Sequence, residues 1–579
     1  MIVPVFDPRG EPVGTIDVES PRTGAFEDRE RDHADARQPD DARTRVDPRD
    51  PTACRPPGDT AATARAPQVA GRGSTDLLTE EFALGCRAMT SKDDWAYRSA
   101  TDTVAALARR EISSRELVEG AIARIEAGDG RINAVVVRDF ERARAAAGRA
   151  DEALAAGERR PLLGVPFTVK ESIDVAGLPK TWGNPAFREF RAEADALAVE
   201  RLKAAGAVLV GKTNVPVMLG DWQTFNEIYG TTNNPYDTRR APGGSSGGSA
   251  AALAAGFVPL ELGSDFFGSL RNPAHCCGVF GHRPTLDVVP MRGGGTPPGA
   301  PAGPSTGGFA VLGPMARSAR DLALAFGVLA GPDPLAEGLA YRLDLPPPRQ
   351  QALPSFRVLL LQDHPLCPTS AEVRAVFDEL AAQLEGAGCA LSRHSSLLPD
   401  LGKINRLFLT VISAAGSAAR PLEEQQPMIA ARDALAPDDE SPSAAFLRGH
   451  GISYRDWMLL LRTRQALFGQ LRALFQSFDV LVCPVAPTAA VPHDHGAMDR
   501  TIEVDGARVP YVVQGSWNTI ASLLGFPVTV APIGRSRSSA LPIGAQIVGP
   551  YLEDQTPLTF AALLEQERGG LFHPPGCSL

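Results

Sequence analysis

Residues 261–273 read Glu-Leu-Gly-Ser-Asp-Phe-Phe-Gly-Ser-Leu-Arg-Asn-Pro, and they place two phenylalanines inside an otherwise polar segment. Ser269 follows a glycine directly, and Asp265 and Arg271 flank it. Glycine, serine and charged residues together are typical of a tight loop, whereas adjacent aromatic rings are typical of a packed core. The segment is therefore either a core turn that contains a serine or a reactive loop with an apolar wall.

A glycine- and serine-rich segment lies upstream at residues 242–250, Pro-Gly-Gly-Ser-Ser-Gly-Gly-Ser-Ala. Its centre, Gly243–Gly247, matches the pattern G-x-S-x-G of a nucleophile elbow, which needs an apolar strand immediately before it. The preceding Thr238–Pro242 is no such strand, because proline lacks the backbone donor. Taken alone, the match indicates a flexible loop.

A second apparent motif lies at Gly206–Thr213, which matches the phosphate-loop pattern G-x-x-x-x-G-K-[ST]. A phosphate loop must follow a strand and open a helix, so that its amides can surround a phosphate. In this chain the four variable residues form an apolar strand themselves, and Pro216 follows soon afterwards. We interpret the segment as a buried strand that ends in a polar turn, not as a nucleotide site.

Short apolar runs recur along the chain and indicate buried strands. They lie at 165–169, 207–210, 356–361, 478–483 and 528–530. Helical patterns alternate with them: Ser113 and Glu116 form a capping box, and Val373, Val376, Phe377, Leu380 and Leu384 follow helical spacing before Gly386. The alternation of strands and helices predicts an α/β fold with a mostly parallel sheet.

The N-terminal part of the chain has a different composition. Residues 2–6 and 12–18 predict a β-hairpin, and residues 1–33 resemble the last strands and following helix of a GAF domain, without its pocket. Residues 34–75 contain no Leu, Ile, Phe, Met, Trp or Tyr. Such a segment cannot bury enough apolar surface to fold. We expect 1–33 to be no independent domain and 34–88 to be a disordered linker or a wrongly assigned start, with Met89 as the initiator.

Composition excludes several classes of protein. The 58 basic and 68 acidic residues give a net charge of −10, so nucleic-acid binding has no electrostatic support. The eight cysteines show no metal spacing or disulfide framework, and no signal peptide or run of about 18 apolar residues is present. We expect a cytoplasmic protein with free thiols, no membrane span, and no metal or other cofactor.

Several segments occur in a fixed order that resembles the amidase signature family. The set begins with Gly164–Asp174, Gly-Val-Pro-Phe-Thr-Val-Lys-Glu-Ser-Ile-Asp, and continues with 242–250 and Gly268–Arg271. Further matching segments are Gly211–Asn214, Tyr229–Pro235, Cys277–Thr285, Leu312–Met315, Gly525–Pro527 and Leu541–Gly549. The resemblance covers residue 92 to the C-terminus and implies one domain, 89–579, with a central twisted, mixed and mostly parallel sheet covered by helices.

The resemblance also implies a catalytic relay of a Ser–cis-Ser–Lys type. It assigns Ser269 as the nucleophile, Ser245 as the bridging serine and Lys170 as the base, with a cis bond between Gly244 and Ser245. Lys170 must lose its proton near neutral pH, so its pKa must fall from about 10.4 to about 7 by burial. Its place at the end of the apolar strand provides this burial, and Glu171 points the other way on an extended chain.

The resemblance assigns the oxyanion hole to backbone N–H groups of four residues. They are Phe266, Phe267, Gly268 and Ser269, with Asp265 and Arg271 supporting their loop. The chain departs from the family at Phe267, where relatives carry glycine, and at Val217, where many carry glutamate. A side chain at position 267 leaves the amide in place but restricts its φ angle and adds a ring beside the nucleophile.

The expected substrate is a small molecule with an apolar acyl or aryl amide. The candidate pocket residues are Trp222, Phe225, Phe266, Phe267 and Trp517, since apolar pockets with a few polar groups suit such ligands. Carbamates and esters are further candidates because they share the acyl-transfer steps. Two alternatives stay open: a subunit of a glutamine-dependent amidotransferase, and a catalytically inactive binding or sensory protein. The sequence leaves the assembly open, a homodimer included.

Overall fold

The structure is a computed structural model that describes residues 95–299, 308–335, 340–418, 420–568 and 574, and the backbone of 2–6 and 12–17. Three expectations lie outside the described residues: the helix that the resemblance of 1–33 to a GAF domain implies, the linker 34–88, and Met89 as the initiator. The chain divides into Met1–Arg72 and Gly73–Leu579. In the first unit, strands β1 (Ile2–Phe6) and β2 (Pro12–Asp17) pair antiparallel, as the pattern predicts.

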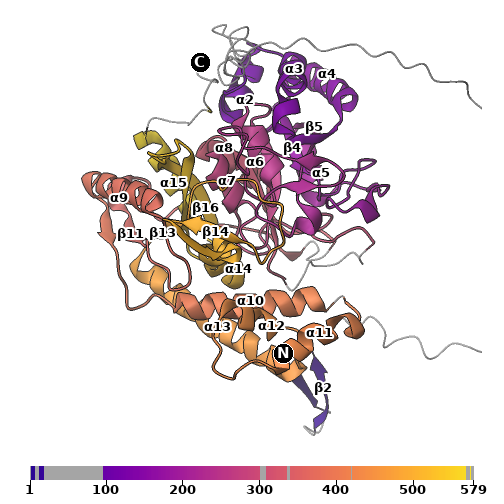
Figure 1. Cartoon of the computed structure of the whole chain (residues 1–579). Coiled ribbons are helices and arrows are strands. Elements are labelled where there is room, and N and C mark those ends of the chain that lie inside the picture. Colours follow the sequence, from indigo (N-terminus) through magenta and orange to yellow (C-terminus); the bar gives the residue numbers. More distant parts are fainter. Residues whose placement is uncertain are drawn as a thin grey trace, which may run out of the picture. The chain divides into compact units, whose positions relative to one another are not determined.

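The second unit is built on a sheet of eleven described strands (Figure 1). In order across the sheet they are β12 (Ala390–Ser392), β11 (Arg357–Leu360), β13 (Val480–Pro484), β17 (Pro542–Val548), β16 (Val528–Arg535), β9 (Phe280–Arg283), β10 (Val311–Ala316), β8 (Leu260–Asp265), β4 (Pro166–Lys170), β5 (Val208–Thr213) and β3 (Val135–Arg138). Each apolar run that predicted a strand in this unit lies wholly or partly in one of them.

The sheet is mixed, and its parallel pairs form two blocks. Strands β12, β11 and β13 form one parallel block, and β8, β4 and β5 form the other. The six remaining pairs are antiparallel. The predicted α/β class and mixed sheet are confirmed, but parallel pairing predominates only inside the two blocks. One reason is the short connection 536–541, because a chain that reverses so tightly can join only antiparallel neighbours such as β16 and β17.

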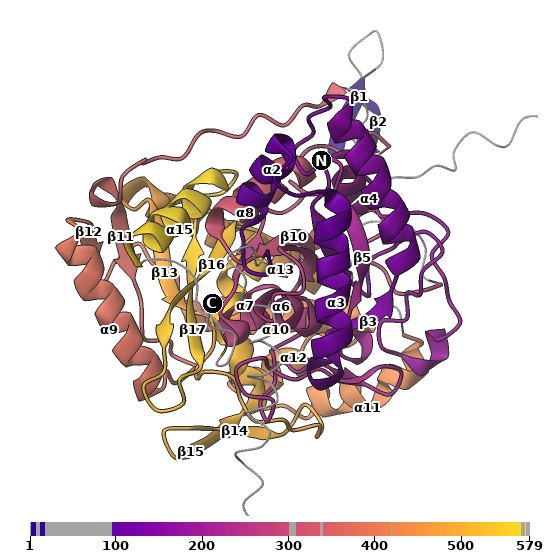
Figure 2. The same cartoon turned by 90° about the horizontal axis from the view of Figure 1, so that it is seen from above.

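Helices cover this sheet (Figures 1 and 2). They are α2 (Ala100–Arg109), α3 (Ser114–Ile132), α4 (Phe140–Ala155), α5 (Leu197–Ala204), α6 (Gly247–Ala254), α7 (Arg271–Cys277), α8 (Ala319–Leu329), α9 (Ala371–Gly386), α10 (Leu401–Ser417), α11 (Leu422–Asp433), α12 (Pro442–Leu447), α13 (Tyr454–Ser477), α14 (Thr519–Leu524) and α15 (Gln555–Arg568). Figure 1 shows α10–α13 as a separate group, on the side of the unit away from α2–α4.

Local sequence signals explain several of these elements. Helix α3 begins with the predicted capping box, in which Ser113 and Glu116 each accept a backbone N–H of the other. Helix α9 buries the five apolar residues that its spacing predicts. The apparent phosphate loop is strand β5, whose Lys212 is fully buried and donates to the carbonyl of Pro179. The interpretation of this segment as a buried strand is therefore confirmed.

Short elements complete the unit around the site. They are the two-residue strands β6 (Phe225–Asn226) and β7 (Gly230–Thr231), the hairpin of β14 (Thr501–Val504) and β15 (Ala507–Pro510), and the 3-10 helices η1 (Pro185–Phe187), η2 (Val217–Leu219), η5 (Leu353–Ser355) and η6 (Tyr511–Asn518). Helix η6 leads directly into α14.

Candidate active site

Three chain segments bring the predicted relay residues together. Lys170 is the last residue of β4, Ser245 precedes α6, and Ser269 lies between β8 and α7. Since β4 and β8 are parallel neighbours, their carboxyl ends lie at the same edge of the sheet. The loop before α6 joins them there, because the N–H of Ser246 donates to the carbonyl of Ser269 at 3.1 Å.

Lys170 is fully buried and its ammonium group is surrounded by serine oxygens. Its Nζ donates to Ser245 Oγ at 2.7 Å, to Ser264 Oγ at 2.9 Å and, more weakly, to the carbonyl of Ser264 at 3.4 Å. Burial lowers the pKa of Lys170 to about 7, although the carboxylates of Asp265 and Glu261 oppose this shift. A lysine in this state can hold or release a proton at neutral pH.

The carboxylate next in sequence to the lysine faces another part of the molecule. Glu171 accepts hydrogen bonds from the backbone N–H groups of Thr181 and Trp182, at 2.6 and 3.0 Å, and from the hydroxyl of Tyr229. It is absent from the carboxylates that raise the pKa of Lys170. The alternation of side chains along an extended strand accounts for this separation.

The two serines differ in exposure. Ser245 is buried, with 1% of its surface exposed, whereas Ser269 is half-buried. The peptide bond between Gly244 and Ser245 is cis, as the resemblance implies. A Cβ at position 244 would lie 2.5 Å from the carbonyl oxygen of Asp221, so only glycine fits there. Ser245 therefore lies inside the protein, and Ser269 is the more exposed of the two serines.

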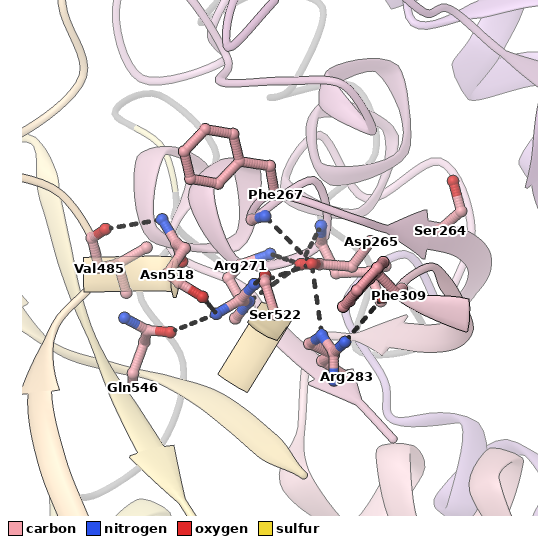
Figure 3. A network of polar contacts seen from close by, with 12 residues as sticks. Ser264, Asp265, Phe267, Arg271, Arg283, Phe309, Val485, Asn518, Ser522 and Gln546 are labelled. Carbon is pink, nitrogen blue, oxygen red and sulfur yellow. Dashed lines mark hydrogen bonds and ion pairs between the residues drawn. The ribbon is translucent and has the colours of Figure 1, made fainter. Parts of the chain in front are cut away.

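Asp265 holds the loop that carries Ser269 (Figure 3). Its carboxylate accepts the N–H groups of Gly268 and Leu270, each at 3.0 Å, and a bidentate pair of hydrogen bonds from the guanidinium of Arg271. Gly268 adopts a φ of +92°, and a Cβ there would lie 2.7 Å from Cγ of Asn518. The Gly268 amide thus already has an acceptor within the protein.

A second guanidinium accompanies this pair. Arg283 Nε lies 3.6 Å from Asp265 Oδ1, and Asp265, Arg271 and Arg283 are all fully buried. Burial alone would raise the pKa of Asp265, but the charge and hydrogen bonds of Arg271, together with Arg283, hold it below its usual range. Burial lowers the pKa of Arg283 to about 9, against the pull of Asp265. Asp265 is therefore an ionised carboxylate whose charge two cations compensate.

Three other amides of the loop differ from that of Gly268. Among the described residues, no protein group accepts the N–H of Phe266, Phe267 or Ser269. The side chain of Phe267 lies edge-on to Trp222, with ring centroids 5.0 Å apart, and against Phe408, with centroids 4.7 Å apart. Its carbonyl accepts the indole N–H of Trp222 at 3.0 Å. The ring is fixed on both sides, while its backbone amide stays available.

The predicted pocket residues do not all meet in one place. Phe266 joins Trp222, Phe267 and Phe408 in one apolar cluster. Phe225 instead stacks on His495, with ring centroids 4.1 Å apart. Trp517 is 1% exposed and packs edge-on against His364, and Trp222 is 6% exposed, so these indoles belong mainly to the core. Val217, the second departure from the family, lies 41% exposed on η2.

Sequence reasoning missed several residues that complete this site. Ser264 binds Lys170, and its place within the quoted segment was the only available signal. Asn518 lies against the Gly268 loop, and Phe408 of α10 packs on both phenylalanines. These two positions lie more than 130 residues from Ser269 in the chain, and nothing in their local sequence connects them with it.

The described residues offer neither a metal site nor a membrane span. No group of three or more His, Cys, Asp or Glu side chains among them could hold a metal ion. None of their helices combines the length and the apolar character that crossing a membrane requires.

Comparison with known proteins identifies the family of this chain. Residues 116–558 match the Amidase family. The chain is 35% identical over 454 residues to AtzE, a subunit of the 1-carboxybiuret hydrolase of Pseudomonas sp. (strain ADP), covering 77% of this chain and 93% of that protein. It is 32% identical to the A subunit of the glutamyl-tRNA(Gln) amidotransferase of Anaeromyxobacter sp. (strain K), covering 81% and 96%.

A solved structure shows the same fold. The 6-aminohexanoate cyclic dimer hydrolase, complexed with its substrate, aligns with a TM-score of 0.67 and 26% identity, and the match covers 84% of this chain and 100% of that one. The family match spans both parallel blocks of the sheet and all three segments of the site. The chain therefore belongs to the amidase family, whose members are hydrolases that act on carbon–nitrogen amide bonds.

Proposed function

We propose that this protein hydrolyses a carboxamide bond through Lys170, Ser245 and Ser269. The observation that carries the proposal is the buried Lys170 amine, 2.7 Å from Ser245 Oγ, with a pKa lowered by burial to about 7. A serine hydroxyl is too weakly acidic to attack an amide without a base. A lysine that is neutral near pH 7 is such a base.

In the proposed reaction, Ser269 Oγ attacks the substrate carbonyl carbon. Its proton passes to Ser245 Oγ as the proton of that hydroxyl passes to Lys170 Nζ. The tetrahedral intermediate then collapses, the carbon–nitrogen bond breaks, and the proton returns along the same relay to the leaving amine. Water attacks the resulting Ser269 ester, loses its proton to the relay, and releases the carboxylic acid and free Ser269. The separation of roles agrees with exposure, since only Ser269 is accessible.

We propose that the N–H groups of Phe266, Phe267 and Ser269 form the oxyanion hole. Gly268 N–H, the fourth expected donor, is engaged by Asp265 at 3.0 Å, so its role is to shape the loop. Within the described part of the chain, the backbone N–H of Phe267 has no protein acceptor, and its ring packs on Trp222 and Phe408. Each well-placed donor is worth roughly 10²–10³ in rate. A phenylalanine in place of the family glycine is therefore compatible with catalysis.

The proposed substrate class is an apolar acyl or aryl amide, with carbamates and esters as further candidates. Support comes from the apolar cluster of Phe266, Phe267, Trp222 and Phe408, which includes the two residues that precede Gly268 and Ser269. The five described cysteines are free and buried. Free thiols support the further proposal that the protein works in a reducing compartment, the cytoplasm.

The test is a panel of anilides, primary amides, carbamates and esters, assayed with wild type, Ser269→Ala and Lys170→Ala. We expect turnover of apolar anilides by wild type and a loss of roughly 10⁴-fold or more in kcat/KM in both variants. Ser172→Ala is the matched control, because Ser172 is a buried serine beside Lys170 whose hydroxyl has no partner. Wild-type turnover only of small charged amides would refute the apolar class, and unchanged kcat/KM in Ser269→Ala would refute the relay.

The same assay addresses the two alternatives. A chain that works within an amidotransferase would need its partner chains to accept the released ammonia, so it would gain activity when they are added. The similarity to the A subunit of an amidotransferase is the reason for testing this alternative. Hydrolysis by the purified chain alone, with Ser269 required, separates a self-sufficient amidase from an inactive binding protein and from an amidotransferase component.

A further inference from the structure

Strand β8 carries a second buried carboxyl group besides that of Asp265. Glu261 is the second residue of β8, and 3% of its surface is exposed. The hydroxyl of Thr213 donates to its Oε1 at 2.7 Å, and the hydroxyl of Thr168 donates to its Oε2. Thr168 is the direct partner of Glu261 in the register between β4 and β8. Both carboxyl oxygens are therefore bound to hydroxyl donors from neighbouring strands.

No cation compensates Glu261 directly. Among the described residues, no arginine, lysine or histidine forms an ion pair with it, whereas Asp265 four residues later has both Arg271 and Arg283. The positive charge of Lys170 acts to lower the pKa of Glu261. Conversely, Asp265 and Glu261 are the two carboxylates that act on Lys170. Since Asp265 is compensated by guanidinium groups, Glu261 is the uncompensated negative charge near the base.

The Glu261 network also connects the elements that carry the relay. Thr168 and Lys170 lie two residues apart on β4 and thus on the same face of the strand. Thr213 of β5 shares a hydrogen bond with Ser249 of α6 at 2.9 Å, and α6 directly follows the loop of Ser245. Through Thr168 and Thr213, Glu261 is therefore linked by hydrogen bonds to the elements that carry Lys170 and Ser245, and its own strand β8 leads to Ser269.

We propose that Glu261 is a positioning residue that sets the proton affinity of Lys170 through its charge. The proposal rests on the proposed function of Lys170 as the base. An anionic Glu261 stabilises the ammonium form of Lys170, and a neutral Glu261 favours the amine that catalysis needs.

The titration of the two groups supports this coupling. Burial raises the pKa of Glu261 to about 7, although the hydroxyl hydrogen bonds and Lys170 oppose the shift. Burial lowers the pKa of Lys170 to the same region. The two groups therefore titrate in one pH range and as a pair, so loss of the Glu261 charge changes the pH at which Lys170 becomes the amine.

The test is the pH dependence of kcat/KM in wild type and Glu261→Gln, measured on the same anilide. In wild type, kcat/KM should fall at low pH as Lys170 becomes protonated, and this fall is the acid limb of the profile. Removing the negative charge lowers the pKa of Lys170, so the acid limb should move about one unit toward lower pH. At a pH one unit below the wild-type limb, the variant then keeps several-fold more of its maximal activity than wild type does. An acid limb that stays in place, in a folded and active variant, overturns the proposal.

Glu171→Gln is the matched control. It neutralises a buried carboxyl group next in sequence to Lys170 that faces Thr181 and Trp182 instead. Its acid limb should coincide with that of wild type, whatever its maximal rate. An equal shift in this control would assign the effect to general changes in buried charge and would overturn the specific role of Glu261.

Thr213→Val provides a second, independent route. It removes a hydroxyl that stabilises the Glu261 anion, so it should shift the acid limb in the same direction, by less. Combined with Glu261→Gln it should add no further shift. If Glu261→Gln does not fold, this variant decides: a shifted limb supports the proposal and an unshifted limb overturns it. Failure of the proposed function is distinct, because wild-type turnover would then not depend on Ser269 or Lys170.

Discussion

At the scale of single residues, the chemistry depends on where Lys170 ends its strand. The apolar residues of β4 carry the lysine into the interior, and burial then lowers its pKa to about 7. Serine oxygens from two further segments receive its N–H groups, so the uncharged amine still has hydrogen-bonding partners. A buried lysine of this kind costs stability, because the unfolded chain binds its proton more tightly than the folded protein does.

The cost predicts how stability depends on pH. Lysine titrates near 10.4 in an unfolded chain and near 7 at this site, so between these values the unfolded state binds more protons and stability rises with pH. The penalty is full below pH 7 and gone above about pH 10. We therefore expect Lys170→Met to be more stable than wild type at pH 7, by a margin that shrinks by about 2 kcal/mol between pH 7 and pH 9.

Urea unfolding at several pH values measures this margin. Lys403→Met is the control, since Lys403 is an exposed lysine on α10 and its removal should give a margin near zero at each pH. A margin for Lys170→Met that does not change with pH would contradict a lowered lysine pKa in the folded protein.

At the scale of elements, the loop that carries Ser269, the proposed nucleophile, is shaped by the 3-10 helix packed on it. Gly515 of η6 lies against Phe267 and Trp222, and Asn518 of the same helix lies against Gly268. A Cβ at position 515 would lie 2.5 Å from Cζ of Phe267 and 2.5 Å from Cζ2 of Trp222. The ring of Phe267 therefore occupies the space that a side chain at position 515 would need.

This complementarity predicts a coupled pair of substitutions. Gly515→Ala should lower the free energy of unfolding by about 1–3 kcal/mol, because the added methyl group overpacks the cluster. In the double variant with Phe267→Ala the added methyl has room, so the combined loss should be smaller than the sum of the single losses. Chemical denaturation of the four proteins measures the coupling. Gly469→Ala on α13, where a Cβ meets nothing within 4 Å, should be neutral or stabilising.

Strict additivity of Gly515→Ala and Phe267→Ala would contradict the packing argument. Turnover of the double variant carries separate information, because it tests whether the amide at position 267 serves catalysis without its aromatic ring.

At the scale of the whole unit, one buried guanidinium joins distant parts of the chain (Figure 3). Arg271 donates to Asp265, to the carbonyl of Asn518, to Ser522 Oγ and to Gln546 Oε1. The last three partners lie 247 to 275 residues away along the chain. The loop that carries Ser269 is thus connected by hydrogen bonds to η6, α14 and β17, which all lie in the C-terminal part of the chain.

Breaking this tie should be costly. Arg271→Met leaves the carboxylate of Asp265 buried with only Arg283 beside it, at 3.6 Å, so we expect a loss of about 3–5 kcal/mol of stability. Adding Asp265→Asn should recover part of the loss, because it removes the unpaired charge. Urea unfolding at pH 7 measures both. Arg239→Met, which breaks the exposed pair with Asp237, should cost no more than about 1 kcal/mol. Equal losses in the buried and exposed variants would contradict this account.

The local sequence was sufficient to predict the N-terminal hairpin, five of the eleven described strands of the large sheet, the capped helix α3 and the three segments that carry Lys170, Ser245 and Ser269. These features depend on neighbouring residues: apolar runs form strands, a serine and a glutamate three apart cap a helix, and an ordered set of short motifs identifies a family. The direction of strand pairing was less predictable, because it depends on how each connection turns.

The features of the site that the sequence did not predict depend on contacts between distant segments, and local sequence patterns do not indicate such contacts. Ser264 as a second partner of Lys170, the engaged amide of Gly268 and the fit of Phe267 against Gly515 all arise from segments brought together by the sheet. The environment of Glu261 is likewise a result of tertiary structure. Its local sequence does not distinguish it from other strand residues, and its hydroxyl partners Thr168 and Thr213 come from other strands. The sequence of this amidase thus specifies which groups are proposed to carry the chemistry. Their pKa values and packing follow from burial, which exists only once distant segments have closed around them.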